Sequence, residues 1–421
     1  MKAFAGKRVL MLLENTTYPW DRRVRREAQA LLGAGYQVTV ISPRGRDEPL
    51  REDVDGVMVY RFPFPPQGKG LAGYVLEFGY ATAAMLILTV WIWLRQGFDV
   101  IHTANPPDTL FVTGALFKLL GKRFVFDQHD LAPEVYLSRD PQAKPSFVYR
   151  ILRWLERCSY AVADVVIATN ESYRRVALER GKKRPEQVFV VRNGPPLSFG
   201  PVPGDPELAN RAPYLIGYIG VMGYQDGVDY WLRAVRELVA TFHRRDFLAV
   251  LIGTGDAAPS LRVLAKDLEI EPYVWFTGRI PDEDALRILS TTHICIHPDP
   301  LNPLNDMSTM TKMMEYMALG KPVVSFDLKE ARYSAQNAAC YAQPNDVLDF
   351  ARNVAWLMDH PQERAGMGAL GRQRVGTTLA WEYSIPHLLE AYMSMRPREE
   401  QGNARQQIPL TQGTVGGRDV D

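Results

Sequence analysis

The fold of this chain is predicted most directly from one stretch, which reads Asn305-Asp306-Met307-Ser308-Thr309-Met310-Thr311-Lys312-Met313-Met314-Glu315-Tyr316-Met317-Ala318-Leu319-Gly320-Lys321-Pro322-Val323-Val324. A polar loop leads into a helix that Ser308 or Thr309 is expected to begin and Gly320 to end, and a buried strand follows. The N-terminus of such a helix presents backbone N–H groups without partners in the helix, which favours anions such as a diphosphate. Glu315 lies about two turns into the helix. The stretch therefore predicts an α/β unit with an anion site beside its helix.

Short apolar runs alternate with helical patterns on both sides of this stretch. One helical pattern in the first half places Phe147, Ile151, Trp154 and Leu155 on one face. Such alternation is typical of a parallel sheet covered on both faces, so we expect the α/β class. The runs expected to be strands are Arg8–Leu13, Gln37–Ser42, Val57–Arg61, Val100–His102, Arg123–Asp127, Val165–Ala168, Val188–Val191, Leu215–Gly220, Phe247–Gly253, Tyr273–Thr277, His293–His297 and Val323–Phe326.

The alternation breaks at Asn193-Gly194-Pro195-Pro196, where a stretch rich in proline and glycine begins. It resumes after residue 213, so we expect two Rossmann-like domains whose ligands bind at the carboxyl ends of the strands. The expected parts are 1–194 as an N-terminal domain, 195–213 as an interdomain linker, 214–380 as a C-terminal domain, 381–396 as a C-terminal helix that packs back on the N-terminal domain, and 397–421 as a disordered tail.

The bulk composition excludes several classes of protein. The chain has 421 residues, more than one ordinary core requires, and its net charge of +1 gives no general attraction to nucleic acid. Its three cysteines, Cys158, Cys295 and Cys340, lack metal-ligand spacing and suit a reducing compartment. The N-terminal apolar run Val9–Leu13 ends at Glu14 and indicates a strand rather than a signal peptide. A cytoplasmic protein is therefore expected.

The segment from Phe78 to Leu94 contains no charged residue and is flanked by Glu77 and Arg95. As a helix it would span about 25 Å, a little short of the hydrocarbon core of about 30 Å. We favour a helix that covers a sheet. A helix that packs on one face and touches lipid with the other is the second possibility, and a membrane-spanning helix is the third.

Three glycine motifs follow one another in the second half. Gly217-Tyr218-Ile219-Gly220-Val221-Met222-Gly223 follows an expected strand, and its glycines would let a ligand's phosphates approach the backbone. Tight packing explains such a turn about as well. The other two motifs are Ile252-Gly253-Thr254-Gly255-Asp256 and Phe276-Thr277-Gly278-Arg279-Ile280-Pro281.

Together with the stretch around Glu315, these motifs resemble the family 4 glycosyltransferases, which are group 1, retaining enzymes of the GT-B fold. The resemblance covers the chain to about residue 395 and implies two Rossmann-like domains that face each other across a cleft. It also implies that the C-terminal domain binds a nucleotide-diphosphate sugar, with the glycine turn facing the diphosphate, the backbone around Arg279 and Ile280 reading the base, and Glu315 holding the ribose. The expected donor-binding residues are Gly220, Gly223, Arg279, Ile280, Ser308, Thr309, Lys312 and Glu315.

Two departures from the family pattern concern the diphosphate and the sugar. The family's two phosphate-binding cations are missing, since Val221 and Gln225 stand in this region. Lys312 is our candidate replacement, with a solvated helix lysine as the alternative. The first glutamate of the family's Glu-x7-Glu pattern is replaced by Met307. Asp306 is expected to reach the sugar hydroxyls instead, or else to cap the helix beside Ser308.

A histidine follows an expected strand of the first half at its carboxyl end, in Phe126-Asp127-Gln128-His129-Asp130. By the resemblance, His129 lines the cleft near the donor sugar, where an imidazole can donate to a hydroxyl or exchange a proton. A purely structural histidine is the alternative. His102, at another strand end, is expected to shape the site. We assign His129, Asp306 and Glu315 as the catalytic residues.

A basic patch follows the first loop, in Arg22-Arg23-Val24-Arg25-Arg26-Glu27. Arginine suits bidentate phosphate binding, and together with the apolar segment the patch suggests an acceptor carried on a lipid phosphate at a membrane. A solvated helix face with salt bridges to Asp21 and Glu27 explains the patch equally well. The expected acceptor-binding residues are Asn15, Thr16, Arg22, Arg23 and Asp130.

The sequence thus predicts a retaining transferase that moves a hexosyl unit from a nucleotide-diphosphate sugar to a glycan or polyprenyl-linked saccharide, in cell-surface polysaccharide synthesis. Peripheral contact with the inner membrane face is expected, and no cofactor, metal or nucleic acid is. Asp299 lacks a second carboxylate at metal-binding spacing, and by the resemblance GT-B enzymes need no bound metal. A GT-B nucleotide-sugar epimerase and a non-catalytic sugar-nucleotide-binding protein stay open as alternatives.

Overall fold

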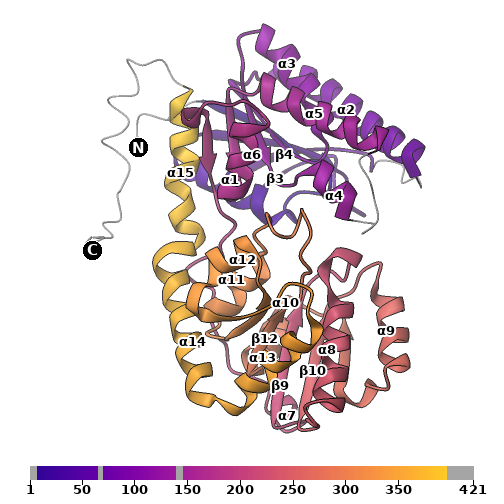
Figure 1. Cartoon of the computed structure of the whole chain (residues 1–421). Coiled ribbons are helices and arrows are strands. Elements are labelled where there is room, and N and C mark those ends of the chain that lie inside the picture. The colour runs from indigo at the N-terminus through magenta and orange to yellow at the C-terminus, as the bar shows by residue number, and fades with distance from the viewer. Residues whose placement is uncertain (1–6, 65–69, 139–145, 396–421) are drawn as a thin grey trace, which may run out of the picture. The chain divides into compact units, whose positions relative to one another are not determined.

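A computed structural model describes residues 7–64, 70–138 and 146–395 of the chain. It divides into two compact units, each built on its own sheet (Figure 1). Unit 1 comprises 1–133, 145–191 and 384–421, and unit 2 comprises 134–144 and 192–383. The segment that we expected to be a linker, 195–213, therefore belongs to unit 2, where it contains the short helix α7 (Pro206–Ala209). The expected disordered tail lies outside the described residues.

Unit 1 contains an eight-stranded sheet in the order β3-β4-β2-β1-β5-β6-β7-β8, parallel except for the β3–β4 pair. The sequence did not reveal β3, because this edge strand is mostly charged and is paired through a turn at Asp55 and Gly56, which both have positive φ. The strands are β1 Arg8–Leu12, β2 Gln37–Pro43, β3 Arg51–Val54, β4 Val57–Phe62, β5 Val100–Ala104, β6 Arg123–Gln128, β7 Val165–Ala168 and β8 Val188–Val190.

Helices cover this sheet. Asp21 caps α1, since its side chain accepts hydrogen bonds from the backbone N–H groups of Arg23 and Val24. The apolar helix α2 is longer than the charge-free segment predicts, because the helix continues through Glu77 back to Gly70. The helices are α1 Arg22–Gly33, α2 Gly70–Arg95, α3 Phe111–Leu119, α4 Ala132–Ser138, α5 Phe147–Val162, α6 Glu171–Glu179 and, from Ser384 onward, α15 Trp381–Ser394.

Unit 2 contains a six-stranded parallel sheet in the order β11-β10-β9-β12-β13-β14. Its strands are β9 Tyr214–Ile219, β10 Phe247–Ile252, β11 Val274–Gly278, β12 Ile294–His297, β13 Val323–Phe326 and β14 Ala339–Ala342. Its longer helices are α8 Val228–Ala240, α9 Ala258–Asp267, α10 Asp282–Thr291, α11 Thr311–Ala318, α12 Lys329–Ala335, α13 Val347–Asp359 and α14 Pro361–Arg374.

Each sheet has a point where the strand order reverses. In unit 1 the reversal lies between β1 and β5, and in unit 2 between β9 and β12. Loops at the carboxyl ends of the strands diverge there and leave room for a ligand. The predicted α/β class with two parallel-sheet domains is confirmed, and these two edges are where the site residues belong.

Candidate active site

The glycine loops of unit 2 gather at the carboxyl edge of its sheet. Gly220 N–H donates to the carbonyl of Ile252 at 3.1 Å, and Gly253 N–H donates to the carbonyl of Gly278 at 3.0 Å. Gly253 has a φ of 123°, and a Cβ on it would lie 2.0 Å from the carbonyl oxygen of Gly220. Close backbone packing therefore explains this glycine.

Two further backbone N–H groups of the glycine turn after β9, those of Met222 and Gly223, already have acceptors. Met222 N–H donates to the carbonyl of Thr254 at 3.0 Å. Gly223 N–H donates to the Oδ2 of Asp226 at 3.0 Å. A diphosphate that uses the amide of Gly223 has to displace this carboxylate. That Gly220 and Gly223 face the diphosphate stays a prediction.

Lys312 lies in a buried group of charges that we call the Lys312 cluster, comprising Lys312, Asp226, Asp299 and His297. Its Nζ lies 2.7 Å from Asp299 Oδ1 and 3.7 Å from Asp226 Oδ1, and it stands over the ring of Tyr218. Burial would lower the pKa of Lys312, but Asp299 and Asp226 together raise it above its ordinary value, so the ammonium is charged. A solvated lysine is therefore the wrong interpretation.

Burial shifts the pKa values of Asp226 and His297 in this cluster. Burial raises the pKa of Asp226 to about 6, against the opposing effect of Lys312. Burial also lowers the pKa of His297 to about 4, so this imidazole is neutral. Carboxylates already offset the charge of Lys312, so a diphosphate would have to compete with them for the ammonium. That Lys312 binds the diphosphate stays a prediction.

The helix start in the quoted stretch differs from the prediction. Helix α11 begins at Thr311 after Met310, and no side chain caps it. Ser308 Oγ donates to the carbonyl of Leu304 at 2.8 Å, and Thr309 Oγ1 donates to Glu330 Oε2 at 3.2 Å. The prediction that Ser308 or Thr309 begins α11 is wrong, because the helix begins at Thr311 and Met310 occupies its N-cap position.

Asp306 serves a different helix from the one expected. Its Oδ1 accepts a hydrogen bond from the backbone N–H of Lys329, at the start of α12, at 2.9 Å. The expectation that Asp306 caps α11 beside Ser308 is therefore wrong. Its role toward the sugar stays a prediction.

Glu315 lies on α11 one turn after Lys312 and is partly buried. The next residue, Tyr316, accepts a hydrogen bond at its hydroxyl from the backbone N–H of Ile219 at 2.9 Å. This bond, with the Lys312–Asp226 ion pair, fixes α11 against the end of β9 and the loop that follows. Arg279 is exposed and Ile280 partly buried just after β11, on the same edge of the sheet.

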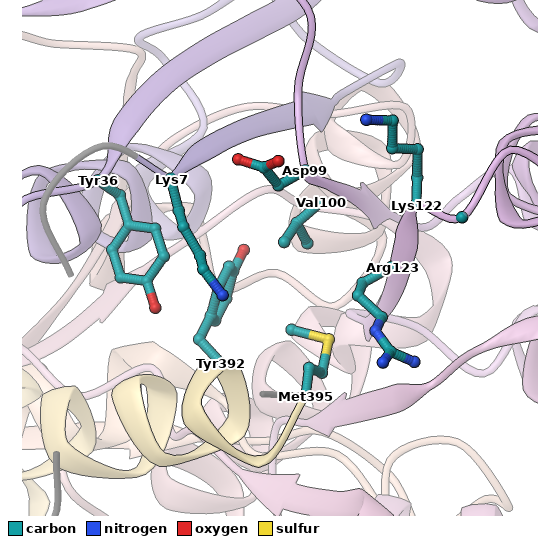
Figure 2. A pocket seen from close by; sticks show the side chains of 9 residues that line it. Lys7, Tyr36, Asp99, Val100, Lys122, Arg123, Tyr392 and Met395 are labelled. Carbon is teal, nitrogen blue, oxygen red and sulfur yellow. The ribbon is translucent and has the colours of Figure 1, made fainter. Parts of the chain in front are cut away.

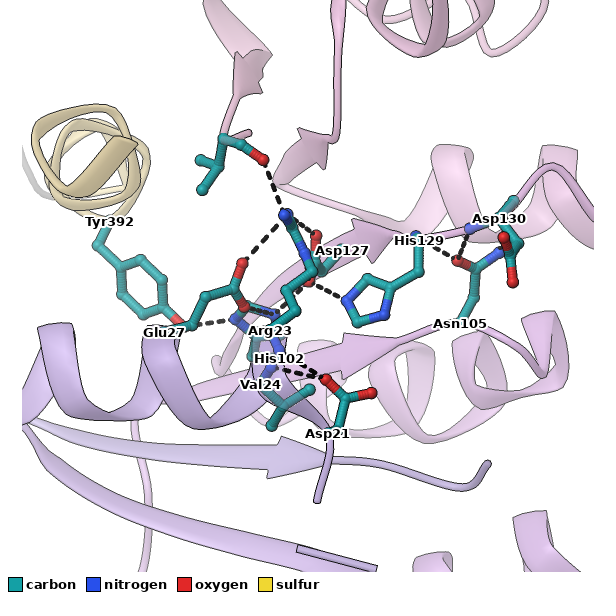
Figure 3. Close-up of polar contacts among 11 residues, drawn as sticks. Asp21, Arg23, Val24, Glu27, His102, Asn105, Asp127, His129, Asp130 and Tyr392 are labelled. Carbon is teal, nitrogen blue, oxygen red and sulfur yellow. Dashed lines mark hydrogen bonds and ion pairs between the residues drawn. The ribbon is translucent and has the colours of Figure 1, made fainter. Parts of the chain in front are cut away.

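Unit 1 holds a second buried group of charges, which we call the Arg23 cluster: Arg23, Glu27, His102, Asp127 and His129 (Figure 3). Arg23 binds Asp127 with two hydrogen bonds, of 3.0 Å from Nε and 2.7 Å from Nη2. It also donates to the carbonyl of Val191 at 2.7 Å and lies 3.1 Å from Glu27. Arg23 was expected to bind an acceptor phosphate, and that is wrong because the guanidinium is buried and these groups take up its donors.

His129 is the member of the Arg23 cluster that reaches the surface. Its Nε2 lies 2.5 Å from Asp127 Oδ2, and 13% of the side chain is exposed. Burial would lower the pKa of His129, but Asp127 outweighs this and raises it to about 8. Burial would likewise raise the pKa of Asp127, but Arg23 and His129 hold it well below its usual range. His129 is therefore an imidazolium at neutral pH, suited to donating a hydrogen bond.

Asn105, after β5, positions the backbone around His129. Its Oδ1 accepts from the N–H groups of His129 at 2.7 Å and Asp130 at 3.2 Å, while its Nδ2 donates to the carbonyl of Asp130. The sequence did not single out Asn105. Its position at the end of a strand beside the order reversal was the available signal.

The deepest part of the Arg23 cluster comprises Glu27 and His102. Burial raises the pKa of Glu27 to about 8, and burial lowers the pKa of His102. His102 Nδ1 lies 2.7 Å from the hydroxyl of Tyr392 on α15. Ligand atoms of Glu27, His102 and Asp127 lie within 4.8 Å of one another, but the guanidinium of Arg23 already supplies positive charge there. The geometry of Glu27, His102 and Asp127 around this guanidinium is therefore that of an ion-paired cluster.

The remaining predicted acceptor residues lie along the carboxyl edge of the unit 1 sheet or beside it. Asn15 and Arg22 are exposed, and Thr16 and Asp130 are partly buried. The sequence pointed to this edge but missed Asp127 as the central carboxylate. An acid within the apolar run Arg123–Asp127 was the signal, because a charge in a buried strand requires a partner.

A cavity of about 180 Å³ lies at the opposite, amino-terminal edge of the unit 1 sheet (Figure 2). Lys7 and Asp99 line it near the starts of β1 and β5, Lys122 and Arg123 near the start of β6, and Tyr392 from α15. None of the predicted site residues lines this cavity.

Solved structures share this architecture. Sucrose-phosphate synthase from Thermosynechococcus elongatus matches with a TM-score of 0.74 at 16% identity, over 92% of this chain and 98% of that one. Anabaena Alr3699/HepE in complex with UDP-glucose matches with a TM-score of 0.66 at 16% identity, over 92% and 100%. The two sheets and their strand-end loops define a protein of the GT-B type, which confirms the predicted fold.

Two family models match the sequence and together cover more than half of it. A Glycosyl transferase 4-like domain matches residues 21–194, and the Glycosyl transferases group 1 model matches residues 213–360. The chain belongs to the group 1 glycosyltransferases, as its motifs predicted, and its N-terminal domain is a glycosyl transferase 4-like domain.

Individual curated relatives match this chain at low sequence identity. D-rhamnosyltransferase WbpZ of Pseudomonas aeruginosa is 25% identical over 154 residues, 36% of this chain and 38% of that protein. The D-inositol 3-phosphate glycosyltransferase of Thermomonospora curvata is 27% identical over 252 residues, 55% and 57%. The matches thus span less than two thirds of these two relatives. The alpha-D-kanosaminyltransferase of Streptomyces kanamyceticus is 23% identical over 360 residues, 81% and 90%.

Proposed function

We propose that this chain transfers a hexosyl unit from a nucleotide-diphosphate sugar to a glycan or lipid-linked saccharide, with retention of configuration, in cell-surface polysaccharide synthesis. The observation that carries the proposal is the gathering of three glycine loops and α11, with Glu315, at the carboxyl edge of the unit 2 sheet, where the strand order reverses beside β9. A Corynebacterium glutamicum relative that is named a GDP-mannose-dependent phosphatidylinositol monomannoside mannosyltransferase supports a lipid-linked acceptor. The reaction would take place in the cytoplasm.

In the proposed reaction the bond between the sugar C1 and the diphosphate oxygen breaks, and a bond from C1 to the acceptor oxygen forms on the same face. The acceptor proton passes to the leaving phosphate oxygen, so no side chain acts as a strong base. His129 fits this scheme as a charged hydrogen-bond donor to the sugar, held by Asp127. We expect no metal requirement, which EDTA treatment of the active enzyme would test.

Nucleotide release from a panel of nucleotide sugars, with and without saccharide acceptors, tests this function. We expect Glu315→Ala to weaken nucleotide binding and His129→Ala mainly to lower kcat, by about 10²-fold. Glu363→Ala, which removes an exposed glutamate from α14, is the matched control for Glu315→Ala. Activity of both site variants equal to wild type would contradict these roles.

The pH dependence of turnover tests the charge state of His129. Its pKa of about 8 predicts that kcat falls as the pH rises through about 8, because the imidazolium loses the proton that it donates. A rate that instead rises through this range would identify His129 as a base.

A non-catalytic nucleotide-sugar-binding protein is the second candidate, favoured by the pairing of Lys312 with two carboxylates. Such a protein would bind the donor and release no nucleotide. An epimerase would convert the donor alone into its epimer. The same panel separates these outcomes from transfer.

A further inference from the structure

The outward side of α2 is apolar, which is the reverse of an ordinary surface helix. Thr89, Met85 and Ala81 are buried on its inner side, and α2 contacts β2 and β4. Its outer stripe follows helical spacing and is formed by Leu76, Gly79, Ala83, Ile87, Trp91 and Leu94. Ile87 is 69% exposed and Leu94 is 72% exposed. A surface helix usually turns charged residues outward, so this stripe indicates an interface.

Two neighbouring helices extend the apolar surface. Trp93 of α2 contacts Phe117 of α3, and Phe111 of α3 contacts Trp154 of α5, so the three helices form one layer (Figure 1). The outer stripe of α3 carries Val112, Leu116 and Leu119, of which Leu119 is 86% exposed, and the exposed Leu120 follows at the C-cap. Phe147 and Trp154 are exposed on α5. We call the outward side chains of α2, α3 and α5 the apolar face.

Cations accompany the apolar face. Residues 75–95, 111–122 and 147–162 contain six lysines and arginines, of which Lys118 is paired with Asp164, but only two glutamates, of which Glu156 is buried. Arg95 stands over the ring of Trp91, and Arg150 stands over the ring of Phe147. Exposed aromatic rings paired with arginines are typical of elements that lie at the boundary between lipid tails and headgroups.

We propose that the apolar face lies on an anionic phospholipid bilayer, with α2 in the plane of the interface. Residues 75–95 are apolar enough to cross a membrane, with a mean hydropathy of 1.7, and only 22% of the apolar window in this segment is buried. Both ends of α2 nevertheless return to one sheet, through β4 and β5, and its inner stripe packs on that sheet. The helix therefore binds the surface of the bilayer and does not span it. The surface charge selects anionic headgroups.

Flotation of the full chain with vesicles tests this surface independently of the proposed reaction. We expect binding to phosphatidylcholine vesicles that contain phosphatidylglycerol, and weaker binding to phosphatidylcholine alone or in 0.5 M NaCl. The double variant Ile87→Gln, Leu94→Gln should lose about tenfold in vesicle affinity, because two apolar side chains no longer enter the lipid. Arg150→Gln with Arg157→Gln should abolish the preference for anionic lipid.

The matched control is Val263→Gln with Leu370→Gln, which changes two exposed aliphatic residues of unit 2. Thermal unfolding of each variant establishes that the fold is retained. Absence of wild-type binding to anionic vesicles would overturn the proposal, as would equal binding by the Ile87, Leu94 variant and the control. A wild-type dimer in light scattering that dissociates in the Ile87, Leu94 variant, without vesicle binding, would assign the face to a second copy of the chain instead.

Discussion

The two units bury the same kind of charge group at the same edge of their sheets, with different outcomes. The Arg23 cluster and the Lys312 cluster each combine a cation with two carboxylates and at least one histidine. In unit 1 the partly exposed histidine is charged, with a pKa of about 8, whereas in unit 2 the buried histidine is neutral, with a pKa of about 4. Unit 1 thus presents His129 at the edge of its sheet as a hydrogen-bond donor that titrates, whereas the Lys312 cluster of unit 2 fixes the position of α11.

The largest expected effect is a loss of stability in the Arg23 cluster, which should be large when Asp127 is replaced and small when Glu27 is replaced. Asp127→Asn should destabilise the protein by about 3 kcal/mol, because it leaves a buried guanidinium without its bidentate partner. Glu27 would then ionise and pair with Arg23, which would recover part of the lost stability. Urea unfolding at pH 7 measures the difference.

Glu27→Gln is the matched control for Asp127→Asn. Its carboxyl has a pKa of about 8 and is already mostly protonated at pH 7, so the change should cost less than about 1 kcal/mol. Equal losses in the two variants would mean that the Arg23 cluster shares its negative charge evenly, contrary to the asymmetric geometry.

The next effect tests whether Lys312 is a structural counterion. Lys312→Met should destabilise unit 2 by about 2–3 kcal/mol, since it leaves Asp299 buried without a cation. Adding Asp299→Asn should restore at least about 1 kcal/mol, a coupling that a double-mutant cycle measures. Unchanged stability with lost nucleotide binding would instead assign Lys312 to the diphosphate.

The sequence predicted the parts of the fold that local patterning determines. Strands Val165–Ala168 and Val323–Phe326 were predicted with their observed bounds, because fully buried runs are continuously apolar. Strand β14 (Ala339–Ala342) was missed, since its sequence Ala-Cys-Tyr-Ala is short and carries two alanines. The extent of α2 was underestimated, because Glu77 does not end the helix.

The sequence located the site loops but not the pairing of their charges. Lys312 was recognised as a cation near the predicted diphosphate, yet its partners Asp226 and Asp299 come from two other loops. Likewise, the sequence placed Arg23 in a basic patch at the start of a helix, whereas the side chain is buried against Asp127. Long-range ion pairs depend on which strands are neighbours, and helical or strand periodicity carries no information about that.

The smallest expected effect concerns Asp226 and the pH. Its pKa of about 6 lies above the ordinary 3.8, so the contribution of Asp226 to stability is fully present below about pH 4 and is lost as the pH rises through 6. Asp226→Asn removes this titration and should gain about 1 kcal/mol relative to wild type between pH 4 and pH 8, a modest value because 17% of the side chain is exposed. Urea unfolding at both pH values measures it, with the exposed Asp256→Asn as the control.

A gain would mean that ionised Asp226 is held at the amide of Gly223 at a cost in stability, as expected if a bound diphosphate normally replaces that carboxylate. No difference between the two pH values would remove this reason for treating the Lys312 cluster as part of the donor site.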